Sequence, residues 1–417
     1  MAACFYGERQ VLDMRCFGKV SPALCMKIIH RFASSKLERC YFLCDLHHHS
    51  SPPPDILQAA VERFLDNYRC DDDLMRDLHT DFPAENANWL PMVAPPRPIN
   101  VLVHCFLLEA LLSTQQGLSE LILDVEFGVF RVPKSKGGHR QHWYLMQPFL
   151  ALQSIQKTCP SLKSYSCELA LYQNSAVDMR HVQMRFLQNS KQLRSVSTRF
   201  ELDKRSLESY GYIHGSLLLE QAVFMLPKWC ARQGNSTINR ENMRIFAEKL
   251  PHLSIVEISF NSRGALKYAG EFLCNLPNMV SLMLKCEFNP SSDIDEGAEM
   301  GLFFGGFGSV LPAKVKKLAM VNIPEEEFGV VFGSDCAELQ ASLRHLCVRF
   351  AWLSGELGRE KLDKIEGFFK SSPHLQRLCV EGYNKQGSPV FSKTLSRRRV
   401  PAAHVWAANH GIRSHAM

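Results

Sequence analysis

Short runs of alternating apolar and polar residues recur along this chain of 417 residues. Residues 250–261 read LPHLSIVEISFN, with Leu253, Val256, Ile258 and Phe260 as the apolar members. Alternation with period two predicts a β-strand with one buried face. The stretches ahead of such runs, for example NRENMRIFAEKL, have helical spacing instead. Proline at the junction cannot continue a helix, so the repeated unit is predicted to be helix, stop, strand.

The alternating pattern can be written L-x-x-L-x-L-x-F, and eight candidate copies share one register. Their first residues are Leu118, Leu162, Leu193, Leu253, Met279, Val315, Leu343 and Leu375. A weaker ninth copy is expected at Leu37, Cys40, Phe42 and Cys44. The long interval over 201–239 holds either an insertion or an undetected copy.

Each unit has one apolar helix stripe and one apolar strand face, and neither can be buried alone. Stacking the units in parallel buries both, so the sequence predicts an α/β solenoid. The expected form is a horseshoe of helix–strand units with a parallel sheet on its concave face. An ordinary α/β domain with parallel strands is the alternative, although buried parallel strands usually read as continuous apolar runs.

Four phrases carry a family resemblance: CPSLKSY, LPHLSIVEI, LPNMVSLML and SPHLQRLCV. They resemble the irregular, ribonuclease-inhibitor-like leucine-rich repeats of the F-box/LRR family, and the likeness covers about 99–383. The segment PPPDILQAAVERFL is similar to the start of an F-box. The resemblance implies that Pro54, Ile56 and Leu57, within 52–65, contact the adaptor of a cullin-type ubiquitin ligase. An amphipathic helix inserted between repeats is the alternative for this segment.

The expected organisation has four parts. Residues 1–50 form an N-terminal cap or first repeat, and 51–90 a helical, weakly F-box-like segment. Residues 91–390 form the leucine-rich-repeat-like solenoid, and 391–417 a basic, flexible tail. Net charge is +6 with the basic residues spread out, so nucleic acid is not an expected partner except through the tail, which carries Arg397, Arg398 and Arg399.

The compartment is expected to be cytoplasmic or nuclear. The start of the chain, MAACFYGERQ, lacks the pattern of a secretory signal. No apolar run reaches the roughly 18 residues of a membrane helix, so no membrane partner is expected. The 15 cysteines are then interpreted as reduced thiols, used mainly as small buried hydrophobes.

No complete catalytic, cofactor or metal motif is present. The segment CYFLCDLHHH offers sulfur and imidazole groups, but not at the spacing of a standard zinc site. The glycines of GAEMGLFFGGFGSVLP lack the preceding strand and the lysine of a phosphate loop. We therefore expect a protein that is not an enzyme and holds no cofactor or metal. An α/β enzyme without a recognisable motif is the least favoured alternative.

Binding by a parallel solenoid is expected on the exposed side of its strands. The expected partner-binding residues are Asp124, Glu168, Arg199, Glu257, Lys285, Arg349 and Glu381. The neighbouring positions Ser259, Met283, Ala319, Val321, Cys347 and Cys379 are expected to be exposed on the same side. The mixed signs suit a protein partner. The predicted function is a protein–protein recognition scaffold and, through the resemblance, a ligase substrate receptor; a repeat module with no ligase link is the alternative.

Overall fold

A computed structural model describes the chain over a set of separate ranges, and everything below concerns these residues. They are 11–14, 22–33, 36–42, 54–56, 58–60, 62, 97–115, 117–123, 159–167, 184, 186–202, 204–226, 240–260, 270, 272–286, 314–333, 341–351, 353, 357–384 and 386–397.

The chain divides into two compact units. The first unit comprises Met1–Arg199 and Tyr212–Leu217, and the second Phe200–Gly211 and Leu218–Met417. The first contains β1 (Val11–Asp13), α1 (Pro22–Phe32), β2 (Arg39–Phe42), α5 (Arg97–Thr114), β3 (Glu120–Leu123), β4 (Ser164–Cys167) and the start of β5 (Ser195–Glu201).

Strands β1 to β5 of the first unit pair in parallel, in the order in which they occur in the sequence. The core side chains occupy equivalent positions in successive strands: Cys40, Leu121, Tyr165 and Val196 are all buried. The predicted ninth copy is confirmed as strand β2, with Cys40 and Phe42 buried. Strand β1 was not predicted, because only two alternating core residues mark it.

The second unit contains the remaining elements. They are α8 (Lys204–Gly211), β6 (Gln221–Leu226), α10 (Arg240–Glu248), β7 (Ile255–Phe260), β8 (Ser281–Cys286), β9 (Lys317–Pro324), η4 (Glu325–Glu327), α12 (Phe328–Val331), β10 (His345–Ala351), α14 (Arg359–Ser371), β11 (Arg377–Tyr383) and β12 (Pro389–Ser396). Strand β6 lies within 201–239, where the sequence left open an undetected copy of the repeat.

In the second unit, even-numbered and odd-numbered strand residues lie on opposite faces of the sheet. From β6 to β11 the strands pair in parallel and in sequence order, so that Val256, Leu282, Leu318, Leu346 and Leu378 lie side by side. These even-numbered residues are buried and form the core face. Odd-numbered residues of β6–β11, up to the bulge in β9, occupy the opposite face, called the odd face below.

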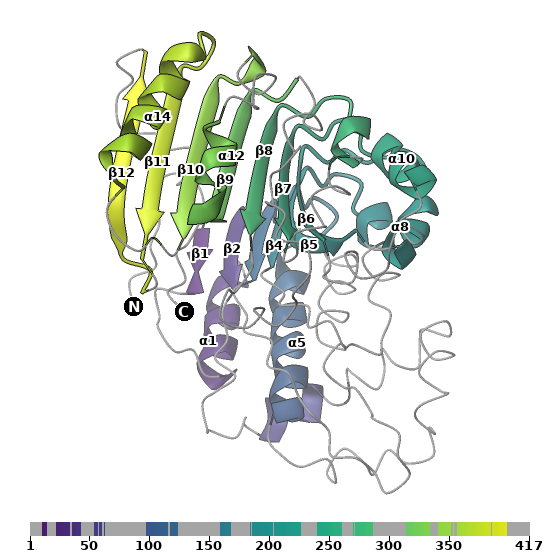
Figure 1. The fold of residues 1–417 in the computed structure, drawn as a ribbon. Coiled ribbons are helices and arrows are strands. Elements are labelled where there is room, and N and C mark those ends of the chain that lie inside the picture. The colour runs from purple at the N-terminus through teal and green to yellow at the C-terminus, as the bar shows by residue number, and fades with distance from the viewer. Residues whose placement is uncertain are drawn as a thin grey trace, which may run out of the picture. The chain divides into compact units, whose positions relative to one another are not determined.

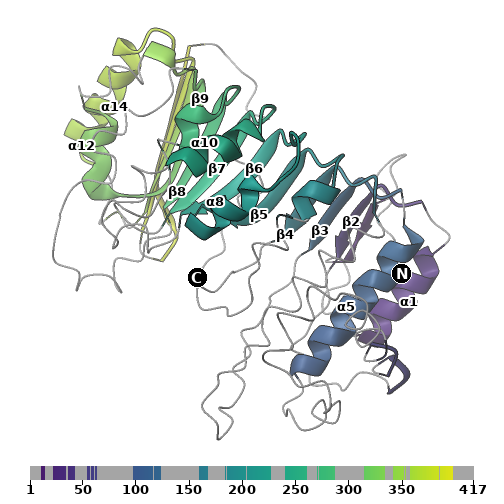
Figure 2. The same ribbon diagram turned by 90° about the vertical axis from the view of Figure 1, so that its right-hand side faces the viewer.

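Helices cover the core face of the second unit. In Figures 1 and 2, α12 and α14 lie against one face of strands β9–β11. Aromatic rings hold helix and strand together: Phe246 of α10 lies 4.6 Å from Tyr210 of α8 and 6.1 Å from Phe224 of β6, between ring centroids. The expected α/β solenoid of helix–strand units with parallel strands is therefore confirmed.

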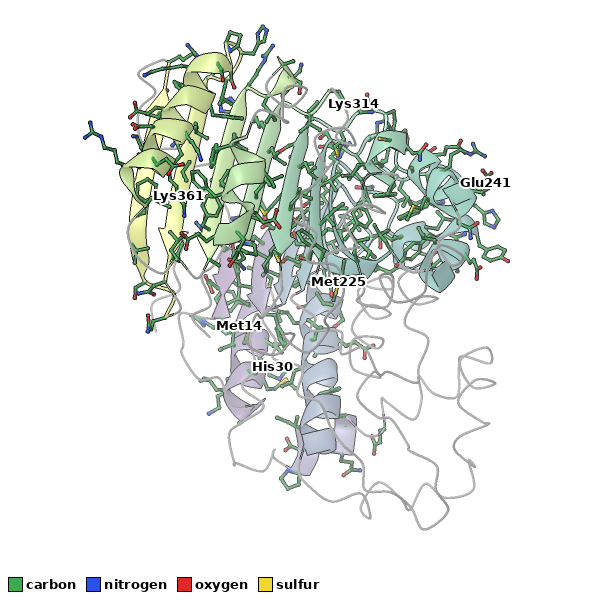
Figure 3. All side chains as sticks on the ribbon, viewed as in Figure 1. Met14, His30, Met225, Glu241, Lys314 and Lys361 are labelled. Carbon is green, nitrogen blue, oxygen red and sulfur yellow. The ribbon has the colours of Figure 1, made fainter. Side chains whose placement is uncertain are left out.

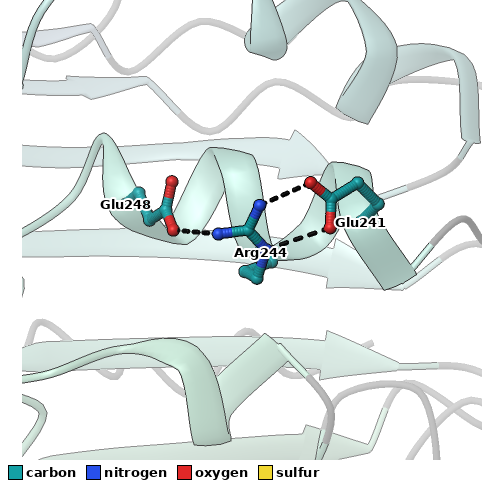
Figure 4. A network of polar contacts seen from close by, with 3 residues as sticks. All are labelled: Glu241, Arg244 and Glu248. Atoms are coloured by element: carbon teal, nitrogen blue, oxygen red, sulfur yellow. Dashed lines mark hydrogen bonds and ion pairs between the residues drawn. The ribbon is translucent and has the colours of Figure 1, made fainter.

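The outer surface of α10 is polar. Arg244 bonds to Glu241 and to Glu248, one helical turn before and after it (Figure 4). These hydrogen bonds lower the pKa of the Glu241 carboxyl and raise that of the guanidinium. The helix thus has one apolar side toward the sheet and one charged side toward solvent.

Lys361 of α14, labelled in Figure 3, contacts the segment that follows β9. Its Nζ forms an ion pair with Glu325 of η4 and lies 5.5 Å from the centroid of the Phe328 ring. Phe328 in turn packs on Phe350 of β10, with ring centroids 5.5 Å apart. The ion pair therefore lies next to an aromatic part of the core.

Strand β9 contains a β-bulge at Asn322. Val321 pairs with Arg349 and Ile323 with Phe350, so Asn322 is the extra residue. Its φ of 58° lies in the left-handed region, which asparagine tolerates better than most residues. The bulge shifts the side-chain alternation, which is why Ile323 rather than Asn322 is buried at the core face.

The last strand, β12, runs antiparallel to β11. The turn before it is ordered by Asn384, whose Oδ1 accepts hydrogen bonds from the backbone N–H groups of Gln386 and Ser388, and by Gly387 at φ 75°. Residues 391–396, expected in the flexible tail, thus belong to a strand; 398–417 lie outside the described residues. Among the described helices, none is both long enough and apolar enough to span a bilayer.

Candidate functional site

The parallel register of the second unit sets the odd-face side chains in three straight rows across five strands. The first row is Ile255, Ser281, Lys317, His345 and Arg377; the middle row is Glu257, Met283, Ala319, Cys347 and Cys379; the third row is Ser259, Lys285, Val321, Arg349 and Glu381. Strand β12 adds Thr394 beside Cys379.

The centre of the odd face is apolar and buried, contrary to expectation. Met283, Ala319 and Val321 form a cluster with exposed fractions of 4, 2 and 5%, and Cys347 packs against it. Ser259 and Cys379, also expected to be exposed, are buried too. Side chains on neighbouring strands are only about 4.8 Å apart and shield one another when they are apolar, so period-two alternation alone does not make this face a solvated one.

At its β10–β11 end, the third row contains an ion pair. Arg349 binds Glu381 Oε2 through Nε at 3.1 Å and through Nη2 at 3.0 Å. The Tyr383 hydroxyl donates to the same oxygen at 3.2 Å, and the guanidinium carbon lies 5.1 Å from the centroid of the Tyr383 ring. Burial raises the pKa of the Tyr383 hydroxyl, which therefore stays protonated and remains a donor at neutral pH.

A pair of thiols occupies the middle row beside this network. Cys347 and Cys379 are directly opposite each other on β10 and β11, and both are free cysteines. A hydrogen bond from the Cys347 thiol lowers the pKa of Cys379 to about 7, against the effect of burial. The same bond, together with burial, raises the pKa of Cys347. Thr394 Oγ1 donates a further hydrogen bond to Cys379 Sγ at 3.7 Å.

The first row becomes cationic over the same strands. His345 pairs with Lys317 on one side and Arg377 on the other. Burial lowers the pKa of the His345 imidazole, and Lys317, Arg377 and Arg344 lower it further because each disfavours another positive charge nearby. At neutral pH the row therefore presents the charges of its lysine and arginine, with a neutral imidazole between them.

The predicted partner-binding residues fall into three groups. Glu257, Lys285, Arg349 and Glu381 lie on the odd face and are partly exposed. Arg349 and Glu381 are brought together and pair with each other, so part of their charge is satisfied within the sheet. Arg199 belongs to strand β5, and the structure does not describe its side chain. Asp124 and Glu168 lie outside the described residues.

The structure describes two of the three predicted adaptor contacts, Pro54 and Ile56. Pro54 is exposed at the start of a short helical stretch, as a contact residue should be. Ile56 is buried, with an exposed fraction of 7%, so its side chain packs inside the chain in this conformation. Leu57 lies outside the described residues. In this conformation the Ile56 side chain contributes to packing, and the adaptor contact stays a prediction.

Sequence reasoning missed four polar or reactive members of the odd face. Lys317, His345, Arg377 and Tyr383 lie just before or after the positions that were assigned to binding. The register would have found the first three, because they precede the middle row by two residues in each strand. Among the described residues, no cluster of His, Cys, Asp and Glu is suited to a metal ion.

Several solved structures are similar to this chain, among them the following two. One is the leucine-rich repeat-containing protein LegL7 from Legionella pneumophila, with 12% sequence identity, a TM-score of 0.39, and coverage of 84% of this chain and 92% of that one. The other is TLR13 in its complex with ssRNA13, with 16% identity, a TM-score of 0.30 and coverage of 64% of this chain. This chain spans 36% of the TLR13 chain. No family model and no curated protein matches the sequence.

Proposed function

We propose that this chain is a protein-recognition scaffold, and that the β10–β12 end of the odd face is part of its binding surface. The observation that carries the proposal is the set of three aligned rows. Stacked parallel strands place a cationic row, a thiol row and an Arg–Glu–Tyr network at the same end of one face. Arrays of this kind bind through such extended faces.

Mixed charge on this face favours a protein partner over a nucleic acid backbone. A phosphate backbone is bound by an excess of lysine and arginine, and the rows place Glu257 and Glu381 among their cations. Tyr and Arg are enriched where protein interfaces concentrate their binding energy, and Tyr383 lies against Arg349 here. The supported partner is therefore a protein surface that itself carries charges of both signs.

Affinity purification followed by mass spectrometry tests this proposal. Lys317→Glu and Lys285→Glu reverse charge on the odd face, and Lys364→Glu reverses it on the exposed surface of α14 as the matched control. We expect the first two variants to lose proteins that wild type and the control retain. Loss of the same proteins from all three variants, or from none, would contradict a binding surface on the odd face.

The finer proposal is a substrate receptor of a cullin-type ubiquitin ligase, acting from the cytoplasm or nucleus. Its support is the sequence resemblance of 52–65 to an F-box. Because Ile56 is buried, the informative variants are Pro54→Asp and Leu57→Asp, with Gln58→Asp as the control on the same segment. A cullin adaptor should copurify with wild type and the control only. If wild type brings down no cullin component, the ligase role is wrong and the plain scaffold remains.

A further inference from the structure

We propose that Cys347 and Cys379 form a reversible oxidation site, at which hydrogen peroxide converts two thiols into a disulfide between β10 and β11. This inference concerns the chemistry of the pair and stands independently of the scaffold role. It goes beyond the expectation that the cysteines of this chain serve only as small buried hydrophobes.

The register gives the pair its geometry. Cys347 and Cys379 are Cα partners in adjacent parallel strands, and both side chains point to the odd face. Neighbouring strands are about 4.8 Å apart. That spacing lies inside the window of about 4.4–6.8 Å between the Cα atoms of a disulfide, and the hydrogen bond between the two thiols keeps the sulfurs in contact.

The surroundings give the two sulfurs different roles. Cys379 Sγ receives hydrogen bonds from the Cys347 thiol and from Thr394 Oγ1, which favour its thiolate, and its thiol can donate to Glu381 Oε1 at 3.9 Å, which favours the protonated form. Arg377 adds a smaller favourable effect, while Glu381 and burial oppose it. Cys347 is the donor in the pair and keeps its proton. Thiolates are the reactive form, so Cys379 is the attacking sulfur and Cys347 the resolving one.

The chemistry proceeds in two steps. The Cys379 thiolate attacks one oxygen of hydrogen peroxide, the O–O bond breaks, hydroxide leaves, and Cys379 becomes a sulfenic acid. Cys347 then attacks the Cys379 sulfur, and its thiol proton leaves with the sulfenic oxygen as water. The two sulfurs together lose two electrons, which reduce the peroxide. Because Cys379 is only 9% exposed, access to its sulfur favours a small oxidant such as hydrogen peroxide.

A second pair of neighbouring thiols in the same chain provides a contrast. Cys40 and Cys159 of the first unit are close enough for the charge of one to act on the other. Both are buried, with exposed fractions of 0 and 4%, and burial raises the pKa of Cys40. Proximity alone therefore does not make a reactive pair; the hydrogen bonds to Cys379 do.

Peroxide treatment of the purified, reduced full chain tests the proposal, with alkylation and peptide mass spectrometry as the readout. We expect a Cys347–Cys379 disulfide in wild type that dithiothreitol reverses, while Cys40 stays a thiol. In Cys347→Ser, Cys379 should stop at the sulfenic acid, which dimedone traps. In Cys379→Ser, Cys347 should stay reduced. A chain in which the exposed Cys274 is oxidised and no Cys347–Cys379 disulfide forms would overturn the proposal.

Two further measurements cover the case in which a serine variant fails to fold. Thr394→Val keeps both cysteines and removes one hydrogen bond to Cys379, so disulfide formation should be slower than in wild type. In wild type, Cys379 should react with iodoacetamide at pH 7 faster than Cys347, since its thiolate fraction is larger. Alkylation of Cys347 before Cys379 would contradict the assigned roles.

Discussion

The side chain of Gln115 joins two backbone segments far from it in sequence: its Oε1 accepts the N–H of Leu37 at 2.9 Å, while its Nε2 donates to the carbonyl oxygen of Phe32, also at 2.9 Å. Gln115 is 2% exposed and directly follows α5, so one amide fixes the end of α1 and the approach to β2. Sequence patterns gave no indication of this role.

Gln115→Leu should therefore destabilise the first unit. Two buried backbone groups would lose their partners, at about 1–3 kcal/mol each, so we expect a loss of about 2–6 kcal/mol in the free energy of unfolding. Urea unfolding followed by circular dichroism measures it. Gln192→Leu, at an exposed turn, is the control and should change stability by no more than about 0.5 kcal/mol. Equal effects of the two variants would contradict the bridging role.

Gly382 and Gly367 predict opposite responses to alanine. A Cβ on Gly382 would lie 2.0 Å from Leu353 Cδ1, which forces β11 or Leu353 to move, whereas a Cβ on Gly367 in α14 meets nothing within 4 Å. Gly382→Ala should destabilise by about 1–3 kcal/mol, as overpacking does. Gly367→Ala should stabilise by about 0.5–1 kcal/mol, because alanine favours a helix. Thermal melts measure both effects. If Gly382→Ala were stabilising, the close approach of Gly382 to Leu353 would be wrong.

The bulge at Asn322 makes a separate prediction about β9. Asn322→Val places a β-branched residue at φ 58° and should cost about 1–3 kcal/mol of stability. Asn322→Gly should be tolerated, since glycine adopts this conformation without strain. Comparing the unfolding midpoints of the two variants isolates backbone conformation from loss of the side chain. If valine were tolerated as well as glycine, the bulge would not lie at this residue.

His345 should make the second unit sensitive to acid. Its pKa is lowered in the folded chain, so as pH falls below about 6.5 the unfolded chain binds a proton first, and stability decreases until the folded imidazole is protonated too. Thermal melts between pH 7.5 and 5 should show a smaller loss for His345→Gln than for wild type. His374→Gln, at an exposed position, is the control. An unchanged pH dependence in His345→Gln would contradict the lowered pKa.

Leu284 and Lys285 test the assignment of faces in β8. Leu284 is fully buried on the core face, and Leu284→Ala should cost about 2–5 kcal/mol. Lys285 is partly exposed on the odd face, and Lys285→Ala should change stability by about 0.5 kcal/mol or less. Chemical unfolding of both variants is sufficient. Equal destabilisation would mean that the register of this strand is wrong.

The sequence was most informative where a strand has one apolar face and one polar face. Strand β10 alternates along its whole length, and its register was predicted correctly. Strand β6 was suspected but not located, because Ala222 stands where other copies have a larger residue. The hairpin to β12 was missed although Asn384 and Gly387 are turn residues, because no repeat pattern accompanies them.

The candidate site was only partly predictable for a different reason. Arg349 and Glu381 occupy the same position in consecutive copies, so the pattern correctly placed them side by side. Whether such neighbours face solvent or bind each other depends on the charge and length of the side chains on both strands. A pattern read from a single copy of the repeat does not contain this information. The pattern also placed Cys347 beside Cys379, but their chemistry depends on Thr394, which belongs to a strand that no copy predicted.

The antiparallel pairing of β11 with β12 also bears on how the second unit folds. Each parallel pair of this unit joins strands separated by a whole crossover, whereas β11 and β12 are joined by the short turn around Gly387. Closing a short loop costs less chain entropy and takes place faster, so this hairpin is expected to form first. Because β12 follows all the other strands of this unit in the chain, a ribosome would release it after them. The preceding strands of this unit would then be synthesised before the hairpin that is expected to start folding.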